Sequence, residues 1–332
     1  PESTDPLASR QLDWGGLILS GLGIFALVYA SIEGNKEGWT SPLILGLFVA
    51  SAVLLVLFVL WERRVADPMM KLELFRLRNF SVGSVIAFVV AFGMLGIFFP
   101  MTLFLQQALG FSPIRAGLTM TPMSMMVMIA APLSGRLTDR IGARWILFTG
   151  TSLMGLGILF IISRTNLDTT WRTLLPALVV TGLGMGMTFA PMTAAAMREV
   201  PPRISGSASG ILNTMRNIGQ VLGIATLGSY LQNRIGVHTT DRLSGVELPT
   251  DLAQSIVQLA RQSQWELIPG LVTDPAQRGA VFMSLQQAFV EALDNTLLVS
   301  SLACFLAAVI ALMVRNPARA AAAFSTALEL AP

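Results

Sequence analysis

The stretch Gly-Arg-Leu-Thr-Asp-Arg-Ile-Gly-Ala-Arg, residues 135–144, lies between two long apolar segments and decides the fold that we expect for this chain. It matches G-x-L-x-D-R-x-G-x-R at six fixed positions, namely Gly135, Leu137, Asp139, Arg140, Gly142 and Arg144. Glycines permit tight turns, an aspartate can face the positive N-terminal end of a helix, and arginines stay at the cytoplasmic headgroups. The pattern therefore predicts a tight cytoplasmic loop between two membrane helices, with Asp139 as its gating residue.

The composition is that of a membrane protein. Hydrophobic residues make up 53% of the chain and charged residues 12%, against about 25% charged in soluble domains. A helix that crosses a bilayer needs about 20 apolar residues. The segments that qualify are 13–32, 41–61, 80–105, 114–134, 145–163, 172–197, 206–231 and 290–314. We therefore expect an all-α integral membrane protein with eight transmembrane helices.

Several classes of function are excluded by what the chain lacks. The net charge of +3 is spread over loops without an aromatic platform, which argues against a nucleic-acid partner. Cys304 is the only cysteine and His238 the only histidine, so an internal disulfide and a site built from several cysteines or histidines are excluded. We expect His238 to be a solvated loop residue, with a role in proton handling as the alternative. Because nucleotide-binding and Ser/His/Asp patterns are missing as well, we expect a protein that is not an enzyme and has no cofactor.

The distribution of positive residues predicts the orientation. With residues 135–144 in the cytoplasm and alternating spans, the short cytoplasmic segments carry Arg10, Arg63, Arg64, Lys71, Arg76, Arg78, Arg136, Arg140, Arg144, Arg198, Arg203, Arg315 and Arg319. The short external loops carry Lys36, Arg115, Arg164 and Arg172. This asymmetry is typical of proteins that follow the positive-inside rule. We expect a multi-pass protein of the plasma (inner) membrane with both ends of this chain in the cytoplasm.

The spans divide into a pair and a bundle. We expect a loop remnant at 1–12, a linker helix pair at 13–61, a cytoplasmic connector at 62–79, a six-helix bundle at 80–314 and a cytoplasmic tail at 315–332. The bundle includes an external loop at 232–285, in which Thr250 or Asp251 is expected to cap a short helix. Asp274-Pro275 is expected to open a second helix that continues into the last span. Since the chain starts with Pro-Glu-Ser-Thr, we expect it to be the C-terminal part of a longer protein.

Two further motifs lie within the predicted bundle, one on each side of residues 135–144. Residues 105–113 read Leu-Gln-Gln-Ala-Leu-Gly-Phe-Ser-Pro, and residues 209–219 read Ser-Gly-Ile-Leu-Asn-Thr-Met-Arg-Asn-Ile-Gly. Together with residues 135–144, they resemble the major facilitator superfamily, and most closely its fourteen-span drug:proton antiporters of the EmrB/QacA type. The resemblance implies that these are the last eight of fourteen spans.

The resemblance also implies a function. It implies proton-driven export of hydrophobic or amphipathic drugs or antibiotics, by alternating access between this bundle and a missing N-terminal six-helix bundle. The external loop is expected to be either a plain cap or a docking surface for an envelope adaptor protein. Two alternatives stay open, namely an exporter of one specific metabolite and a membrane receptor or scaffold that kept the fold without transporting.

Candidate site residues lie on four of the predicted spans. Arg216 lies about 11 residues inside the seventh span, where a charged side chain is costly in lipid, and Asn213, Asn217 and Gln220 share its helix face. This polar stripe is either a cavity wall for substrate or a structural arginine bonded to carbonyls of a neighbouring helix. The expected polar companions in the cavity are Thr119, Ser124, Thr181 and Thr188. Glu291 and Asp294, at the outer start of the eighth span, are the candidates for proton coupling. On the seventh span, the small-residue pairs Gly206 with Gly210 and Gly219 with Gly223 are expected to let helices pack closely.

Overall fold

The computed structural model describes residues 13–65, 68, 70–246, 248–262, 264–272 and 274–315, and every regular element in them is helical. The long helices are α1 (Trp14–Glu37), α2 (Pro42–Glu62), α3 (Arg78–Leu103), α4 (Pro113–Ile141), α5 (Ala143–Ile162), α6 (Trp171–Met197), α7 (Ser205–Leu243) and α10 (Pro275–Ala311). The short elements are η1 (Leu72–Arg76), the π-helical turn η2 (Phe104–Ala108), η3 (Pro202–Ile204), α8 (Thr250–Arg261), η4 (Trp265–Leu267) and α9 (Ile268–Leu271). The predicted loop remnant 1–12 lies outside the described residues, as does all of the predicted tail except Arg315.

Seven helices in the described part of the chain are long and apolar enough to cross a membrane, namely α1, α2, α3 (continued through η2), α4, α5, α6 and α10. The all-helical, multi-pass fold class is thereby confirmed. The predicted seventh span is α7, which is the longest helix, with 39 residues, but it is not among the seven. Polar side chains along its first half, including Arg216, lower its apolar character. Its place as an eighth span therefore stays a prediction.

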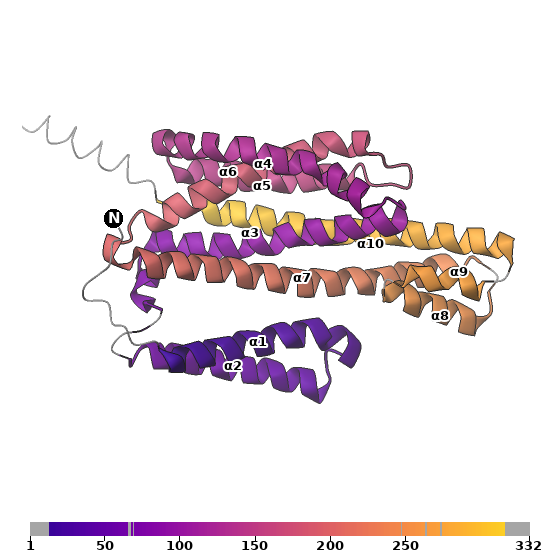
Figure 1. Cartoon of the computed structure of the whole chain (residues 1–332), viewed down its shortest axis with the longest axis horizontal. Coiled ribbons are helices and arrows are strands. Elements are labelled where there is room, and N and C mark those ends of the chain that lie inside the picture. The colour runs from indigo at the N-terminus through magenta and orange to yellow at the C-terminus, as the bar shows by residue number, and fades with distance from the viewer. Residues whose placement is uncertain are drawn as a thin grey trace, which may run out of the picture.

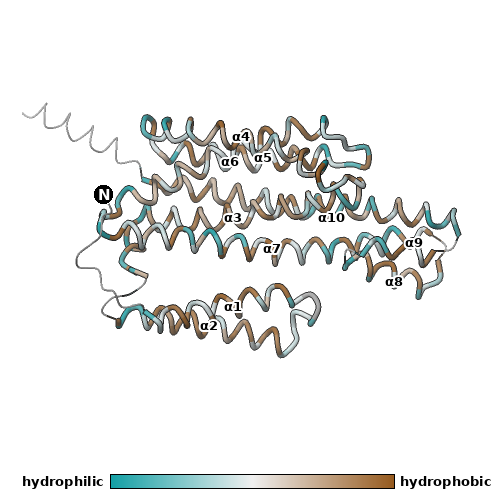
Figure 2. Tube along the Cα trace, viewed as in Figure 1, coloured by the Kyte–Doolittle hydropathy of each residue, from teal (hydrophilic) through white to brown (hydrophobic). Residues whose placement is uncertain are grey.

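The helices are arranged in layers that run along one common direction (Figure 1). In the bundle, α6 packs against both α4 and α5, while α10 packs against α3, α5 and α7. The α1–α2 hairpin lies beside α7 and touches it through α1. Figure 2 shows apolar residues along the middle of the helices and polar residues gathered towards their ends. This distribution is the one that a bilayer requires of helices that cross it.

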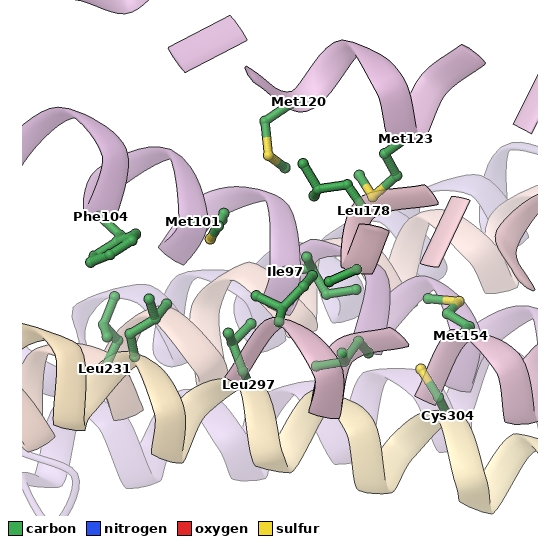
Figure 3. Packing of buried hydrophobic residues seen from close by; sticks show 14 of the residues in the cluster. Ile97, Met101, Phe104, Met120, Met123, Met154, Leu178, Leu231, Leu297 and Cys304 are labelled. Atoms are coloured by element: carbon green, nitrogen blue, oxygen red, sulfur yellow. The ribbon is translucent and has the colours of Figure 1, made fainter. Parts of the chain in front are cut away.

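Close packing rather than polar bonding fills the interior. Met101, Met123 and Cys304 are fully buried in a cluster that joins several helices (Figure 3). The predicted small-residue contacts of α7 are confirmed for one pair, because a Cβ atom on Gly219 would lie 2.3 Å from the carbonyl oxygen of Phe88 on α3, and one on Gly223 would lie 2.6 Å from that of Phe92. Between helices in lipid, such close backbone approach is a main source of association. The predicted contacts are wrong for Gly206 and Gly210, where an added Cβ would meet nothing within 4 Å.

The segment 135–144 is not the tight loop that we predicted. Helix α4 continues through it to Ile141, and α5 begins at Ala143, so Gly142, with φ of 87°, is the turn. Gly135 is an ordinary helical residue with open space around it. The helix continues because each backbone N–H keeps its partner one turn back, up to the bond from Gly142 N to Thr138 O.

The predicted external loop 232–285 is largely helical as well. Helix α7 runs on to Leu243, and the predicted short helix is α8, with Ile256 and Ala260 fully buried. The cap prediction is wrong in detail, because the N-cap of α8 is Pro249 and makes no side-chain bond. The prediction that Pro275 opens a helix running unbroken into the last span is confirmed by α10. Figure 1 shows α7 and α10 projecting together beyond α4, α5 and α6, with α8 and α9 packed beside them.

Candidate functional site

Three helix ends meet where α3 begins, and one buried asparagine joins them. Asn79 is 1% exposed. Its amide nitrogen donates to Glu199 Oε1 at 2.8 Å and to the carbonyl oxygen of Arg315 at 3.2 Å, and its amide oxygen accepts from Arg315 N at 2.8 Å. The start of α3 is thus fastened to the chain just after α6 and just after α10. Sequence reasoning missed Asn79, because nothing in its local pattern distinguishes it from a surface asparagine.

The end of α4 lies next to this junction. A cavity of about 450 Å³ is lined by Asn79, Thr138, Asp139, Ala143, Ala194, Ala195, Met197, Arg198, Val314 and Arg315. Asp139 is exposed and lines this cavity together with Ala143, the first residue of α5. Among the described residues it forms no ion pair, although two arginines line the same cavity. The remaining motif residues, Leu137 and Arg140, are also exposed, whereas the guanidinium of Arg144 lies 5.4 Å from the ring centre of Trp145.

Helix α7 carries a polar face that the other described elements leave open. Asn213 and Asn217 are exposed, and Arg216 and Gln220 are partly exposed. Arg216 donates to Asn213 Oδ1 at 2.6 Å on its own helix. In the part of the chain that the structure describes, it makes no hydrogen bond to a carbonyl of a neighbouring helix, as the structural alternative would require. The predicted stripe is therefore a continuous polar surface on the outside of this bundle.

The predicted companions of Arg216 do not share that surface. Thr181 and Thr188 are fully buried, and their hydroxyls donate to Ala177 O and Gly184 O within α6. Thr119 is 6% exposed and donates to Arg115 O. We therefore correct the cavity prediction for these three, because hydroxyls that satisfy carbonyls of their own helix can be buried at little cost. Ser124 is exposed on α4.

The two candidate proton-coupling carboxylates both lie on α10. Asp294 Oδ1 accepts from the hydroxyl of Thr165, in the turn between α5 and α6, at 2.7 Å. Glu291 accepts from Arg242 and lies 3.1 Å from His238 Nδ1, both on α7. His238 is therefore not the solvated loop residue that we expected. It is a helical residue held between two helices.

Helices of this length and apolar character define a multi-pass membrane protein built from a helical bundle. The comparison with family models places the chain more closely, since residues 12–224 match the Major Facilitator Superfamily. The chain belongs to this superfamily, whose members are transporters and not enzymes. The expectation of a non-enzymatic transport protein is thereby confirmed.

Related proteins are named as drug-resistance proteins and as antibiotic transporters. The chain is 38% identical over 223 residues to the multidrug resistance protein Stp of Mycobacterium tuberculosis, covering 67% of this chain and 41% of that protein. It is 27% identical over 315 residues to the tetracenomycin C resistance and export protein of Streptomyces glaucescens, covering 93% and 57%. It is 32% identical over 248 residues to the probable actinorhodin transporter of Streptomyces coelicolor, covering 72% and 42%. The chain thus spans about half the length of the curated relatives that it matches.

A solved structure shares the fold. The chain matches a bacterial homologue of the human lysosomal transporter Spinster in an inward-facing, occupied conformation, with a TM-score of 0.50 and 19% identity, covering 92% of this chain and 68% of that one. At this identity the likeness concerns the fold alone.

Proposed function

We propose that this chain is the C-terminal part of a fourteen-span, proton-coupled exporter of hydrophobic or amphipathic drugs or antibiotics. Alternating access would proceed by rocking of this bundle against an N-terminal six-helix bundle around a central site. The multidrug resistance protein among the relatives supports the substrate class. In this proposal the protein lies in the plasma (inner) membrane, with both ends of the chain in the cytoplasm, and α7 is its eighth span.

The polar face of α7 carries this proposal. An arginine near the middle of a membrane costs about 2.5–3.5 kcal/mol on insertion scales, so it faces protein or a water-filled cavity. Arg216 lies about 16 Å along α7, at 1.5 Å per residue, and its described partner is Asn213 on the same helix. A second bundle that covered this face only in part would leave a polar cavity between the two. Planar guanidinium and amide groups there would bind polar parts of an amphipathic substrate.

The remaining parts of the proposal concern gating and energy coupling. Asp139, with its arginine neighbours across the cavity, holds the cytoplasmic side shut in one conformation. Glu291 and Asp294 take part in proton movement on the outer side. The helical cap formed by α8 and α9 is the surface on which an envelope adaptor protein would dock.

A second candidate is export of one specific metabolite. The names of two relatives favour it, since one exports tetracenomycin C and the other is a probable actinorhodin transporter. A single-substrate exporter would share the fold, the gate and the polar face, and would differ in the breadth of compounds that compete for export. A receptor or scaffold would fail to transport any of them.

The test is efflux of a fluorescent amphipathic dye from cells that express this chain joined to its N-terminal bundle. We expect efflux from the joined protein and none from this chain alone, because one bundle supplies only one side of the site. Competition by several unrelated drugs supports the multidrug exporter, and competition by one compound only supports the metabolite exporter. Absence of any efflux from a folded, joined protein would contradict transport.

Arg216 is tested in the same assay. Arg216→Ala is expected to lower efflux at least tenfold without loss of folded protein, and Arg216→Lys to restore it only in part, because an ammonium group cannot replace a planar fork of donors. Arg203→Ala, at an exposed arginine of η3, is the matched control and should leave efflux unchanged. A fall in melting temperature with normal efflux per folded molecule would make Arg216 structural instead.

A further inference from the structure

A polar cluster joins the outer part of α7 to α10. His238 Nδ1 lies 3.1 Å from Glu291 Oε2, and His238 Nε2 lies 3.0 Å from Asn295 Nδ2. Arg242, one turn further along α7, donates to the other oxygen of Glu291 and, at 2.6 Å, to Gln287 Oε1. The side chains of His238 and Glu291 are 19% and 38% exposed. Each nitrogen of the only histidine in the chain therefore has a partner on α10.

The chemistry of the partners fixes where the protons lie on the ring. A carboxylate only accepts hydrogen bonds, so the nitrogen that faces Glu291 must carry a proton. An amide can either donate through its nitrogen or accept through its oxygen. Asn295 therefore donates to the bare Nε2 of a neutral ring, and after a half-turn of its amide it accepts from the protonated Nε2 of a charged ring. The same three side chains satisfy both protonation states of His238.

The charges around the ring decide what a bound proton does. Those within one turn on α7, on the facing part of α10 and on α8 are Arg234, Asp241, Arg242, Glu291, Asp294 and Arg261, of which Arg261 packs over Gly236. The side chain that reaches α10 from the turn between α5 and α6 is Thr165, which is uncharged. Of the charged groups, Glu291 is the one in hydrogen-bond contact with the ring. Arg242 bonds to the other oxygen of the same carboxylate, so a charged ring would share Glu291 with one further cation.

We propose that His238 is a proton-binding site that fastens the outer parts of α7 and α10 more firmly when its ring is charged. Proton binding turns the hydrogen bond to Glu291 into an ion pair and keeps the bond to Asn295. The stabilisation is present at low pH and is lost as the pH rises and the ring gives up its second proton. Only one part of this rests on the proposed function: the proton comes from the external side if the membrane orientation is as proposed.

The ring itself is tested by nitrogen NMR. Because His238 is the only histidine, the chain purified with a histidine-free tag and labelled in histidine gives ring signals from this residue alone. We expect the neutral ring at pH 8.5 to carry its proton on Nδ1, and both nitrogens to be protonated at pH 5. A neutral ring protonated on Nε2, or a ring whose charge does not change over this range, would overturn the proposal.

The fastening of the helices is tested by hydrogen exchange of the backbone amides in 286–296. The exchange rate of His238→Gln divided by that of the wild-type chain is measured at pH 5 and at pH 8.5, which cancels the intrinsic effect of pH. We expect this ratio to be about threefold higher at pH 5, as suits a partly exposed ion pair. An equal ratio at both pH values would refute a proton-dependent contact.

Two variants locate the partner of the charged ring. In a Glu291→Gln background the same ratio should not depend on pH, because the amide keeps a hydrogen-bond acceptor but removes the charge. In an Arg242→Gln background the pH dependence should persist, because the contact from His238 to Glu291 remains. Glu266→Gln, at an exposed carboxylate near α9, is the matched control and should behave as the wild-type chain. Persistence of the pH dependence in the Glu291→Gln background would remove Glu291 from the site.

Discussion

Substitution of Gly219 by alanine should destabilise the chain, while the same substitution at Gly210, two and a half turns earlier on the same helix, should not. At Gly219 the added Cβ atom would lie 2.3 Å from the carbonyl oxygen of Phe88 and 3.0 Å from its carbonyl carbon. At Gly210 it would meet nothing within 4 Å. Both positions are helical, so the two variants differ in their neighbours and not in backbone conformation.

The size of the effect follows from these distances. Ordinary contact for a Cβ begins at 3.4 Å, so α7 would have to move about 1.1 Å away from α3, whose backbone cannot yield as a side chain would. Overpacking of this kind costs about 1–3 kcal/mol. Alanine recovers up to about 1 kcal/mol through its higher helix propensity. We expect a net loss of about 1–2 kcal/mol for Gly219→Ala and a gain of about 0.4–1 kcal/mol for Gly210→Ala.

The assay is thermal unfolding of the purified chain in detergent, followed by intrinsic fluorescence. At about 2–4 °C per kcal/mol, Gly219→Ala should lower the melting temperature by several degrees, and Gly210→Ala should leave it unchanged or raise it slightly. Gly223→Ala, whose Cβ would lie 2.6 Å from the carbonyl oxygen of Phe92, should follow Gly219. Equal melting temperatures for Gly219→Ala and Gly210→Ala would refute the argument that backbone contact with α3 holds α7 in the bundle.

Three further predictions concern sidedness, the gate and the end junction. In a Cys304→Ser background, a cysteine at Arg140 should resist an impermeant thiol reagent in intact cells and one at Gln258 should react; the opposite pattern would invert the topology. In the joined transporter, Asp139→Asn should lower efflux at unchanged expression. Normal efflux would show that residues 135–144 have no gating role and only end α4. Asn79→Leu removes three hydrogen bonds, each worth about 0.5–1.5 kcal/mol, so it should lower the melting temperature and speed amide exchange near the end of α10, and unchanged exchange there would exclude the junction.

The sequence predicted where helices lie better than where they end. The apolar segments 80–105 and 172–197 match α3 and α6 to within two residues. The fourth and seventh predicted spans end 7 and 12 residues too early, because an apolar window stops at the first charged residues while the hydrogen-bonded helix does not. A helix that leaves the membrane loses its apolar character and keeps its backbone bonds, so hydropathy alone cannot mark its end.

The exposed polar face of α7 was predictable from the sequence, and its role as a substrate site stays a prediction. Arg216 and its neighbours stand out because polar residues at helical spacing within an apolar segment can be recognised from the local sequence alone. Thr181 and Thr188 were misplaced because a threonine that bonds to its own helix looks the same in sequence as one that faces a cavity. The contacts of His238 were missed because its partners lie more than 50 residues away on α10, and only the packing of the two helices brings them together.

Because α7 and α10 project past the rest of the bundle, the helical cap formed by α8 and α9 moves further than the rest of the bundle when the bundle tilts. At 1.5 Å per residue, helices of 39 and 37 residues are about 58 Å and 55 Å long, which exceeds a hydrocarbon core of about 30 Å by roughly 25 Å. If the bundle tilts as a rigid body by about 10° about the membrane midplane, a point about 40 Å from the midplane moves by about 7 Å, while a helix end at the membrane surface, about 15 Å away, moves by about 3 Å. Anything bound to α8 would therefore be displaced by each tilt without a mobile loop or hinge of its own.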